Sequence, residues 1–119
     1  MDKDVAAFVQ TLLHSGTIAH ILHLQTTSYA EHKALGKFYP KIIELADSFA
    51  ESYQGKFDTR IKGYTDEFHA VQEATPYIES ILDFVSESRE HLPQDTELQN
   101  IVDEIADLIN STLYLLSLK

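Results

Sequence analysis

The sequence predicts an all-α fold of four helices in a single domain, residues 1–119. Apolar residues recur at three- and four-residue spacings along most of the chain, as on the buried side of amphipathic helices. The chain has only four glycines and three prolines, too few for the many turns of an all-β fold. Two short breaks and one longer connection separate the periodic segments, and this order predicts a four-helix bundle.

The first two helices are predicted to form a tight hairpin. The first apolar stripe covers about residues 4–26, and the second helix is expected to begin at Tyr29. Ser28 and Glu31 have the spacing of a capping box, in which each side chain bonds a free backbone N–H at the start of a helix. The turn is therefore expected between Gln25 and Tyr29.

Glycine and proline mark three points in this hairpin. The Ser15-Gly16 pair admits a kink or a break in the first helix, because a glycine inside a helix costs about 1 kcal/mol relative to alanine. Pro40 removes one backbone hydrogen bond, so a bend is expected near residues 36–40. Gly55 can take the left-handed conformation that ends helices, and the second helix is expected to end there.

The second half of the chain is predicted to hold the other two helices. Residues 55–74 are expected to form a connection that passes over the bundle and contains a short helix. The Thr75-Pro76 pair is a good start for the third helix, which is expected to end near His91. Asp95 is expected to cap the fourth helix, which has the cleanest apolar stripe and runs almost to the last residue.

Charge and composition exclude several classes of function. The chain has 19 acidic and 9 basic side chains, and its net charge of −10 repels nucleic acid and anionic membrane surfaces. It has no cysteine, which excludes disulfides, thiolate zinc sites and cysteine nucleophiles. The amino terminus lacks a secretory pattern, and we expect no window to approach the ~20 apolar residues of a membrane span. These features predict a soluble, cytoplasmic protein without nucleic-acid or membrane partners.

Three histidines lie close to the predicted turn. His20 and His32 are each about six residues from it, ~9 Å along their helix axes, and are expected to face each other across the hairpin. In one unbroken helix the same side chains would be ~18 Å apart. Histidines near a helical turn are most often solvated or singly hydrogen-bonded, and a metal site that includes His23 is the other interpretation. The remaining histidines are isolated and are expected to be structural or solvated: His14, His69 and His91.

Asp47 and Glu51 are carboxylates one helical turn apart, on one face of the second helix. Such a pair can hold a cation, although in an acidic protein it is usually a solvated face. His32 and Asp47 are 15 residues apart, ~22 Å along a straight helix, which is too far for two ligands of one ion. Two copies with their second helices antiparallel about a two-fold axis would place the imidazole end of each beside the carboxylate end of the other.

The order His20, His32, Asp47 and Glu51, with gaps of 12, 15 and 4 residues, resembles the ferroxidase region of a known family. This family is the DNA-protection-during-starvation (Dps) proteins, the mini-ferritins. The run DSFAE at residues 47–51, with a glycine shortly after it, is similar to the Asp-x-x-Ala-Glu run and trailing glycine of that family. The resemblance covers residues 18–55.

The resemblance implies a ferritin-like four-helix bundle with the longer connection between the second and third helices. It implies that the protein binds Fe(II) between subunits, promotes its oxidation by O₂ or peroxide, and stores or detoxifies the product in a homo-oligomeric shell. That shell would be built on a two-fold dimer and would reach a dodecamer. The implied metal ligands are His20, His32, Asp47 and Glu51, with His23 as a substitute ligand or a supporting partner. Zinc or another divalent cation is the alternative metal.

The chain also departs from the pattern of that family. Gly36 stands where the family usually has an acidic residue, and Ile21 stands at the place of its common tryptophan. The glycine-containing loop and the basic amino-terminal tail are absent. These departures favour a second interpretation, a ferritin-like assembly or interaction bundle that has lost the metal chemistry. A third interpretation, an acidic mimic of nucleic acid, depends on the net charge alone.

Overall fold

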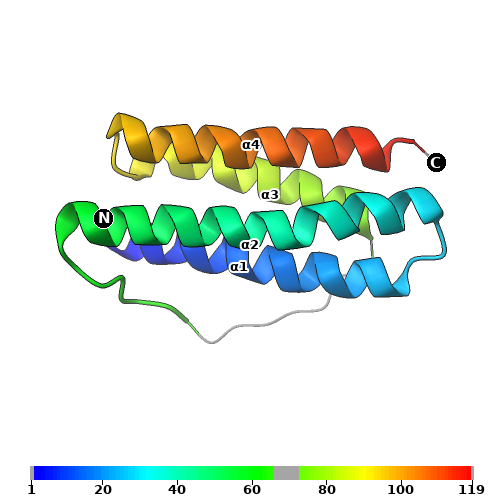
Figure 1. Cartoon of the computed structure of the whole chain (residues 1–119), viewed down its shortest axis with the longest axis horizontal. Coiled ribbons are helices and arrows are strands. Elements are labelled where there is room, and N and C mark those ends of the chain that lie inside the picture. The colour runs from blue at the N-terminus through cyan, green and yellow to red at the C-terminus, as the bar shows by residue number, and fades with distance from the viewer. Residues whose placement is uncertain (1, 66–72, 119) are drawn as a thin grey trace.

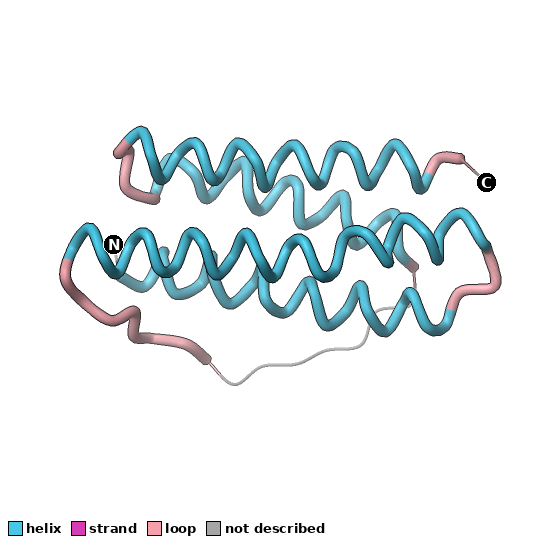
Figure 2. Tube along the Cα trace, viewed as in Figure 1, coloured by secondary structure: helices cyan, strands magenta, loops and turns pink. Residues whose placement is uncertain are grey.

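The computed structural model describes residues 2–65 and 73–118, and these residues form helices joined by loops (Figure 2). The elements are α1 (Asp2–Gln25), α2 (Tyr29–Phe57), α3 (Ala74–Ser88), the short 3₁₀ turn η1 (Arg89–His91) and α4 (Thr96–Leu116). No strand occurs in the described part of the chain. The prediction of an all-α fold with four main helices is confirmed.

The helices are arranged as two antiparallel pairs packed against each other (Figure 1). α1 and α2 form one pair, and α3 and α4 form the other. α3 runs in the same direction as α2, since both begin at the same end of the molecule (Figure 1). The ring of Phe8 on α1 joins three helices, because it lies 4.9 Å from the ring of Phe49 on α2 and 6.3 Å from that of Phe84 on α3.

One apolar core lies between the two helix pairs, and its removal from water is the main force that holds them together. The largest fully buried side chains come from all four helices: Phe8, Leu12, Ile18, Leu35, Phe38, Ile42, Phe49, Ile78, Leu98, Ile105, Ile109 and Leu116. Two buried hydroxyls are satisfied within their own helices, because Ser15 donates to the carbonyl of Leu12 and Thr112 to that of Leu108. The predicted apolar stripes therefore form this core.

Gly16 has a packing role rather than a helix-breaking one. α1 is continuous through Gly16, and this residue is buried against α2. A Cβ atom at position 16 would lie 2.8 Å from Cγ1 of Ile43, closer than real Cβ contacts allow. The glycine therefore permits α1 and α2 to approach closely. α2 likewise runs through Pro40 as one helix.

Of three predicted helix boundaries, the structure confirms one and shifts the other two. Gly55 lies inside α2, and the left-handed position is taken by Asp58, with φ of 48°. Aspartate adopts this conformation more easily than most side chains. α3 begins before Thr75, with Glu73 as its N-cap residue. Asp95 is at the N-cap position of α4, as predicted, but its side chain makes no capping bond and pairs instead with Lys56 at 3.2 Å.

The connection after α2 lies along α1 in its described part, residues 58–65. The side-chain amide of Gln10 donates to the Thr65 carbonyl at 2.6 Å and accepts from the Thr65 backbone N–H at 2.6 Å. Ile61 is buried, which adds an apolar anchor. Residues 58–65 contain no helix, and the rest of the predicted short helix, with His69, lies outside the described residues.

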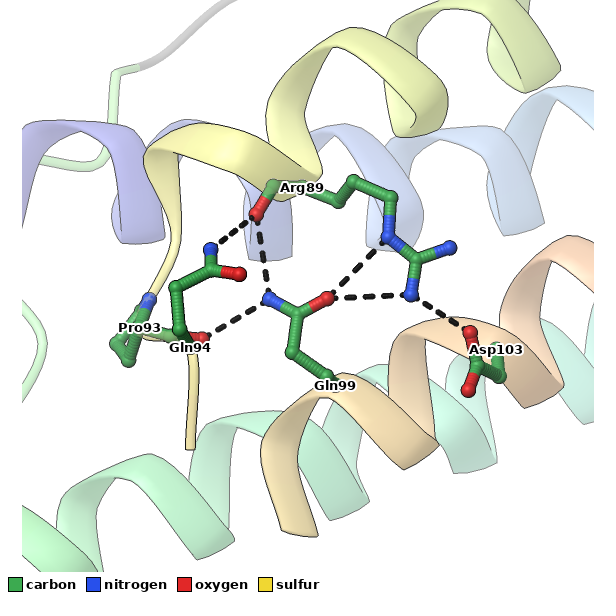
Figure 3. A network of polar contacts seen from close by, with 5 residues as sticks. All are labelled: Arg89, Pro93, Gln94, Gln99 and Asp103. Atoms are coloured by element: carbon green, nitrogen blue, oxygen red, sulfur yellow. Dashed lines mark hydrogen bonds and ion pairs between the residues drawn. The ribbon is translucent and has the colours of Figure 1, made fainter. Parts of the chain in front are cut away.

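The turn between α3 and α4 is fixed by a glutamine that bonds both sides of it (Figure 3). The side-chain oxygen of Gln99 accepts from the Arg89 guanidinium at 3.1 and 3.2 Å, and its NH₂ group donates to the carbonyls of Arg89 and Pro93. Arg89 also pairs with Asp103 at 2.6 Å. Gln94 donates to the Arg89 carbonyl from the other side. This network closes the second helix pair.

α1 is long and apolar enough, by length and composition, to cross a membrane, so the expectation that no window approaches a span is wrong. The window has a mean hydropathy of 1.4, and 56% of it is buried inside the bundle. Its apolar residues include the buried face that packs on the other helices. Core helices of soluble proteins and signal sequences share these properties.

Candidate functional site

The turn between α1 and α2 is where the sequence places it, between Gln25 and Tyr29. The Ser28 hydroxyl accepts from the backbone N–H of Glu31 at 3.2 Å, as in the predicted capping box. The other half of the box is replaced, because the Ser28 N–H donates to the Thr26 hydroxyl at 3.1 Å. That hydroxyl donates to the Glu31 carboxylate at 3.0 Å. Thr26 thus links the two halves of the cap.

His23 and His32 form a reciprocal pair across this turn. Nδ1 of His23 lies 2.7 Å from the His32 carbonyl oxygen, and Nδ1 of His32 lies 2.9 Å from the His23 carbonyl oxygen. A carbonyl only accepts, so each Nδ1 carries the hydrogen and Nε2 keeps its lone pair in the neutral ring. The two rings stack, with centroids 3.8 Å apart and an angle of 16° between their planes.

His20 lies about one turn before His23 on α1, and its ring stacks on that of Tyr39 of α2. Their ring centroids are 4.0 Å apart and the planes are nearly parallel, at 7°. The ring of His20 is 6.2 Å from that of His23. The predicted opposition of His20 and His32 is therefore wrong in detail, because His32 faces His23 and His20 faces Tyr39. All three imidazoles nevertheless form one histidine cluster between α1 and α2, near the turn that joins them.

Gly36 makes room for the His23 ring. A Cβ atom at position 36 would lie 3.0 Å from Cε1 and 3.2 Å from Nδ1 of His23. In the sequence, Gly36 is notable only because it stands where the resembled family has a carboxylate. The structure shows a steric reason for the glycine, because a side chain here would contact the His23 ring. An aspartate introduced at this position would have to displace His23.

Asp47 and Glu51 are both exposed on α2, far along the helix from the imidazoles. His32 and Asp47 lie on one continuous helix, so their separation of 15 residues corresponds to ~22 Å. Among the described residues, no group of three or more histidine, aspartate or glutamate side chains is arranged to hold a metal ion. The described chain therefore brings the histidines together but leaves the carboxylates apart from them.

The stacked rings of His23 and His32 cannot bind one ion between them in this arrangement. A metal ion lies in the plane of the imidazole that binds it, ~2 Å from the nitrogen. Two nearly parallel planes whose ring centroids are 3.8 Å apart do not converge on a common point at that distance. In this arrangement the two Nε2 atoms could therefore not share one ion.

Charge on the exposed side of α2 changes sign near Pro40. Lys33 and Lys37 precede this proline. The acidic residues follow it: Glu44, Asp47 and Glu51. All of these side chains are exposed, and the ion pair of Lys41 with Glu44, at 3.3 Å, spans the change of sign. The half of α2 beside the histidines therefore has a net charge of +1, because Glu31 offsets one of its two lysines, and the acidic half beyond Pro40 has a net charge of −1, because Lys41 and Lys56 offset two of its three carboxylates.

Two histidines have other surroundings. His14 lies on the α3 side of α1 and lines a cavity there. His91 is exposed at the end of η1, with Nε2 3.8 Å from the Glu90 carboxylate. His14 borders the α1–α3 cavity and His91 lies at the end of η1, so neither is part of the histidine cluster at the α1–α2 turn.

The fold and these side chains define a class of small helical protein with a histidine-rich hairpin and a charge-divided second helix. A model of a family of unknown function, DUF5856, matches residues 23–116. The chain therefore belongs to the DUF5856 family. The matched segment includes three of the predicted site residues besides His23, namely His32, Asp47 and Glu51, and it begins after His20.

A relative from a bacteriophage extends over nearly the whole chain. It is an uncharacterized 14.6 kDa protein from the mobD-ri intergenic region of Enterobacteria phage T4, 26% identical over 113 residues. The alignment covers 94% of this chain and 87% of the phage protein. No solved structure matches the chain.

Proposed function

We propose that this protein is a ferritin-like, metal-binding bundle that takes Fe(II) as its substrate at sites completed between two copies. It oxidises the iron with O₂ or peroxide and holds the ferric product in a homo-oligomer. One observation carries the proposal: imidazoles gather at one end of the α1–α2 hairpin, while carboxylates lie on the exposed side of α2 at the other end.

The order and direction of the helices support the ferritin-like part of the proposal. A bundle with a single long connection between its second and third helices is the arrangement of ferritin-like folds. α2 and α3 run in the same direction, and the chain between them returns along α1 in residues 58–65 (Figure 1). The two short turns join antiparallel neighbours, as that topology requires.

The orientation of the imidazoles supports their role as ligands. Metal-binding histidines almost always donate the hydrogen of the other ring nitrogen to a carbonyl or carboxylate, which fixes the ring. His23 and His32 make this bond through Nδ1 and keep Nε2 for a metal. His20, held against Tyr39, lies beside them. Imidazole with carboxylate is a ligand set that iron and zinc both accept.

A two-fold arrangement of α2 would complete the site. If two copies pair with α2 antiparallel and crossing near Pro40, His32 lies beside the partner's Asp47 and the partner's Glu51. The same arrangement places Lys33 and Lys37 opposite the partner's acidic half. Each copy then supplies both halves of a site, and two equivalent sites form.

The second candidate function is an assembly or interaction bundle without metal chemistry. The observation that favours it is the structural role of the same residues. The two Nδ1 bonds close the α1–α2 hairpin, and Gly36 is accounted for by the His23 ring. In this alternative the histidines stabilise the hairpin, and Asp47 and Glu51 are solvated.

Iron binding and oxidation distinguish the two candidates. We expect the protein to bind Fe(II) under nitrogen with affinity in the micromolar range and, after admission of air, to develop ferric absorbance faster than buffer does. Asp47→Ala should lose both properties because a carboxylate ligand is removed, while Asp107→Ala, an exposed aspartate on α4, should keep them. Zinc should inhibit the oxidation, since it is redox-inert and accepts the same ligands.

The control for assembly is the particle mass of each variant, measured on the same samples. If the wild-type protein holds no metal and oxidises Fe(II) no faster than buffer, the iron proposal is wrong and the interaction bundle replaces it. Equal loss of activity in Asp47→Ala and Asp107→Ala would also contradict the proposed site.

A further inference from the structure

The side of α1 opposite the histidine cluster borders a cavity. A cavity of about 400 Å³ opens between α1 and α3 and is bordered by Gly63 and Thr65 of the connection. Its volume is in the range of sites for small ligands. Ala7 and Thr11 line it from α1, and Ile81 and Phe84 line it from α3.

Small residues keep this space open. Ala7 and Thr11 are one turn apart on α1 and project little side-chain volume toward α3. On the other border, Gly63 has φ of 100°, a left-handed backbone that favours glycine. Gln10 holds the connection in place through its bonds to Thr65. The cavity is therefore bounded by anchored elements on each side.

Tyr77 supplies an unused polar group in the wall. Its side chain is 9% exposed, and its hydroxyl has no hydrogen-bond partner in the part of the chain that the structure describes. Burial raises the pKa of this hydroxyl to about 12, so it keeps its hydrogen at neutral pH and can donate it. A buried hydroxyl without a partner is unfavourable, and a bound acceptor would remove this penalty.

The remaining chemistry of the wall favours an uncharged ligand, because His14 is the one ionisable imidazole among the described lining residues and none of them has a carboxylate. The described residues that line the cavity include no carboxylate, ammonium or guanidinium group. Its walls combine aliphatic, aromatic and hydroxyl side chains with the amide of Gln10 and the imidazole of His14. Apolar walls with few polar groups are typical of sites for small organic molecules.

We propose that this cavity binds a small uncharged aromatic molecule with a carbonyl group that accepts a hydrogen bond from Tyr77. The ring of the ligand packs against Phe84 and Ile81, and the Tyr77 hydroxyl selects the carbonyl. This cavity is separate from the histidine cluster, and the proposed binding does not involve a metal.

The test uses two probes of similar shape, acetophenone and ethylbenzene, of which only acetophenone has an acceptor. We expect acetophenone to cause saturable shifts in the backbone amide NMR signals of Ala7, Thr11, Ile81 and Phe84, in the presence of a chelator. It should bind about tenfold more tightly than ethylbenzene, the effect of one hydrogen bond. In Tyr77→Phe the two probes should bind equally.

Two leucine substitutions on α1 serve as a matched pair. Ala7→Leu fills the cavity and should abolish binding of both probes, whereas Thr17→Leu, on the exposed side of the same helix, should leave binding unchanged. Helix content by circular dichroism confirms that each variant is folded. Absence of saturable shifts, binding retained in Ala7→Leu, or an acetophenone preference retained in Tyr77→Phe would overturn the proposal. Because the chelator removes metals, these outcomes are independent of the iron experiment.

Discussion

Gly36 and the imidazole of His23 are in such close contact that a side chain at position 36 would change the site. The ring fills the space beside the α2 backbone, and its Nδ1 reaches the His32 carbonyl. A larger residue would push the ring outward and lengthen this bond. The conformation of the histidine pair therefore depends on the absence of a Cβ atom.

We predict opposite effects for alanine at two glycines of α2. Gly55→Ala should raise the free energy of unfolding by roughly 0.5–1 kcal/mol, because alanine favours a helix and nothing lies within 4 Å of its Cβ position. Gly36→Ala should lose that gain, and destabilise by about 1 kcal/mol, because His23 must shift. Urea unfolding of both variants measures the difference.

The cause of the Gly36 penalty can be checked in a His23→Ala background. Without the imidazole, Gly36→Ala should become stabilising, as at Gly55. A penalty that persists in this background would show that the ring is not its source.

The sequence predicted which histidines gather at the turn but not how they pair. The capping pattern of Ser28 and Glu31 located the turn, and the distance from the turn placed the histidines at one end of the hairpin. Which imidazoles face each other depends on the rotation of α1 against α2, and this follows from the packing of the two helices, which includes the close approach of Gly16 to Ile43. No local sequence pattern specifies this rotation. The sequence therefore predicts His20 opposite His32, whereas in the structure His20 lies against Tyr39.

Gln99 determines how α3 turns into α4. Its side chain bonds the Arg89 guanidinium and two backbone carbonyls, so it satisfies groups that the end of α3 leaves free (Figure 3). Asp103, by contrast, makes an exposed ion pair with the same arginine. The two contacts differ in burial, and this difference sets their contributions.

We predict that Gln99→Ala destabilises the protein more than Asp103→Ala does. Loss of Gln99 leaves the buried Pro93 carbonyl without its side-chain donor and removes the bonds to the Arg89 guanidinium, which should cost about 1–3 kcal/mol, while the Arg89 carbonyl keeps Gln94 as a donor. Loss of Asp103, whose side chain is 61% exposed, should cost less than about 1 kcal/mol, as exposed ion pairs do. Thermal unfolding of the two variants provides the comparison, and equal destabilisation would contradict the role given to Gln99.

Helices were predictable from the sequence, while some of their ends depended on distant residues. Four amphipathic stripes and the Asp95 cap were sufficient for the helices of the bundle. The end of α2 could not be predicted from such patterns, because the chain beyond it is held by Gln54. The side-chain oxygen of Gln54 accepts from the Ile61 backbone N–H at 3.0 Å. Ile61 is buried in the core, and α2 continues past Gly55 to Phe57, with Asp58 as its C-cap residue. Such a tertiary contact is not a local sequence signal.

Charge is distributed unevenly over the whole molecule. Residues 74–116, which include α3 and α4, have nine acidic side chains and one basic side chain, Arg89. Residues 2–57, which include α1 and α2, have six acidic and five basic side chains. Two copies that approach through α3 and α4 repel each other, whereas the α1–α2 side is nearly neutral and self-complementary along α2. Association through α2 is thus the arrangement that electrostatics favours.

We predict that charge reversal on α2 controls dimer formation. Lys37→Glu or Glu44→Lys alone should weaken the dimer about tenfold, because each change replaces an attraction by a repulsion at two symmetric places. The double variant should restore it, since the complementary pair is recreated with its signs exchanged. Sedimentation at several protein concentrations measures the dissociation constant. A monomeric wild type, or a double variant weaker than both single variants, would contradict this interface, whatever the outcome of iron binding.

The close packing at Gly16 also has a consequence for the chemistry of the hairpin. α1 and α2 come close together there, because Cγ1 of Ile43 lies 2.8 Å from the place where a Cβ atom of residue 16 would be. The stacked pairs His20–Tyr39 and His23–His32 lie further along the same two helices. Their ring centroids are 4.0 and 3.8 Å apart, and this stacking requires that α1 and α2 remain close to each other. A larger residue at position 16 would therefore be expected to move the two helices apart and to separate the stacked rings, although residue 16 is not itself part of either stacked pair.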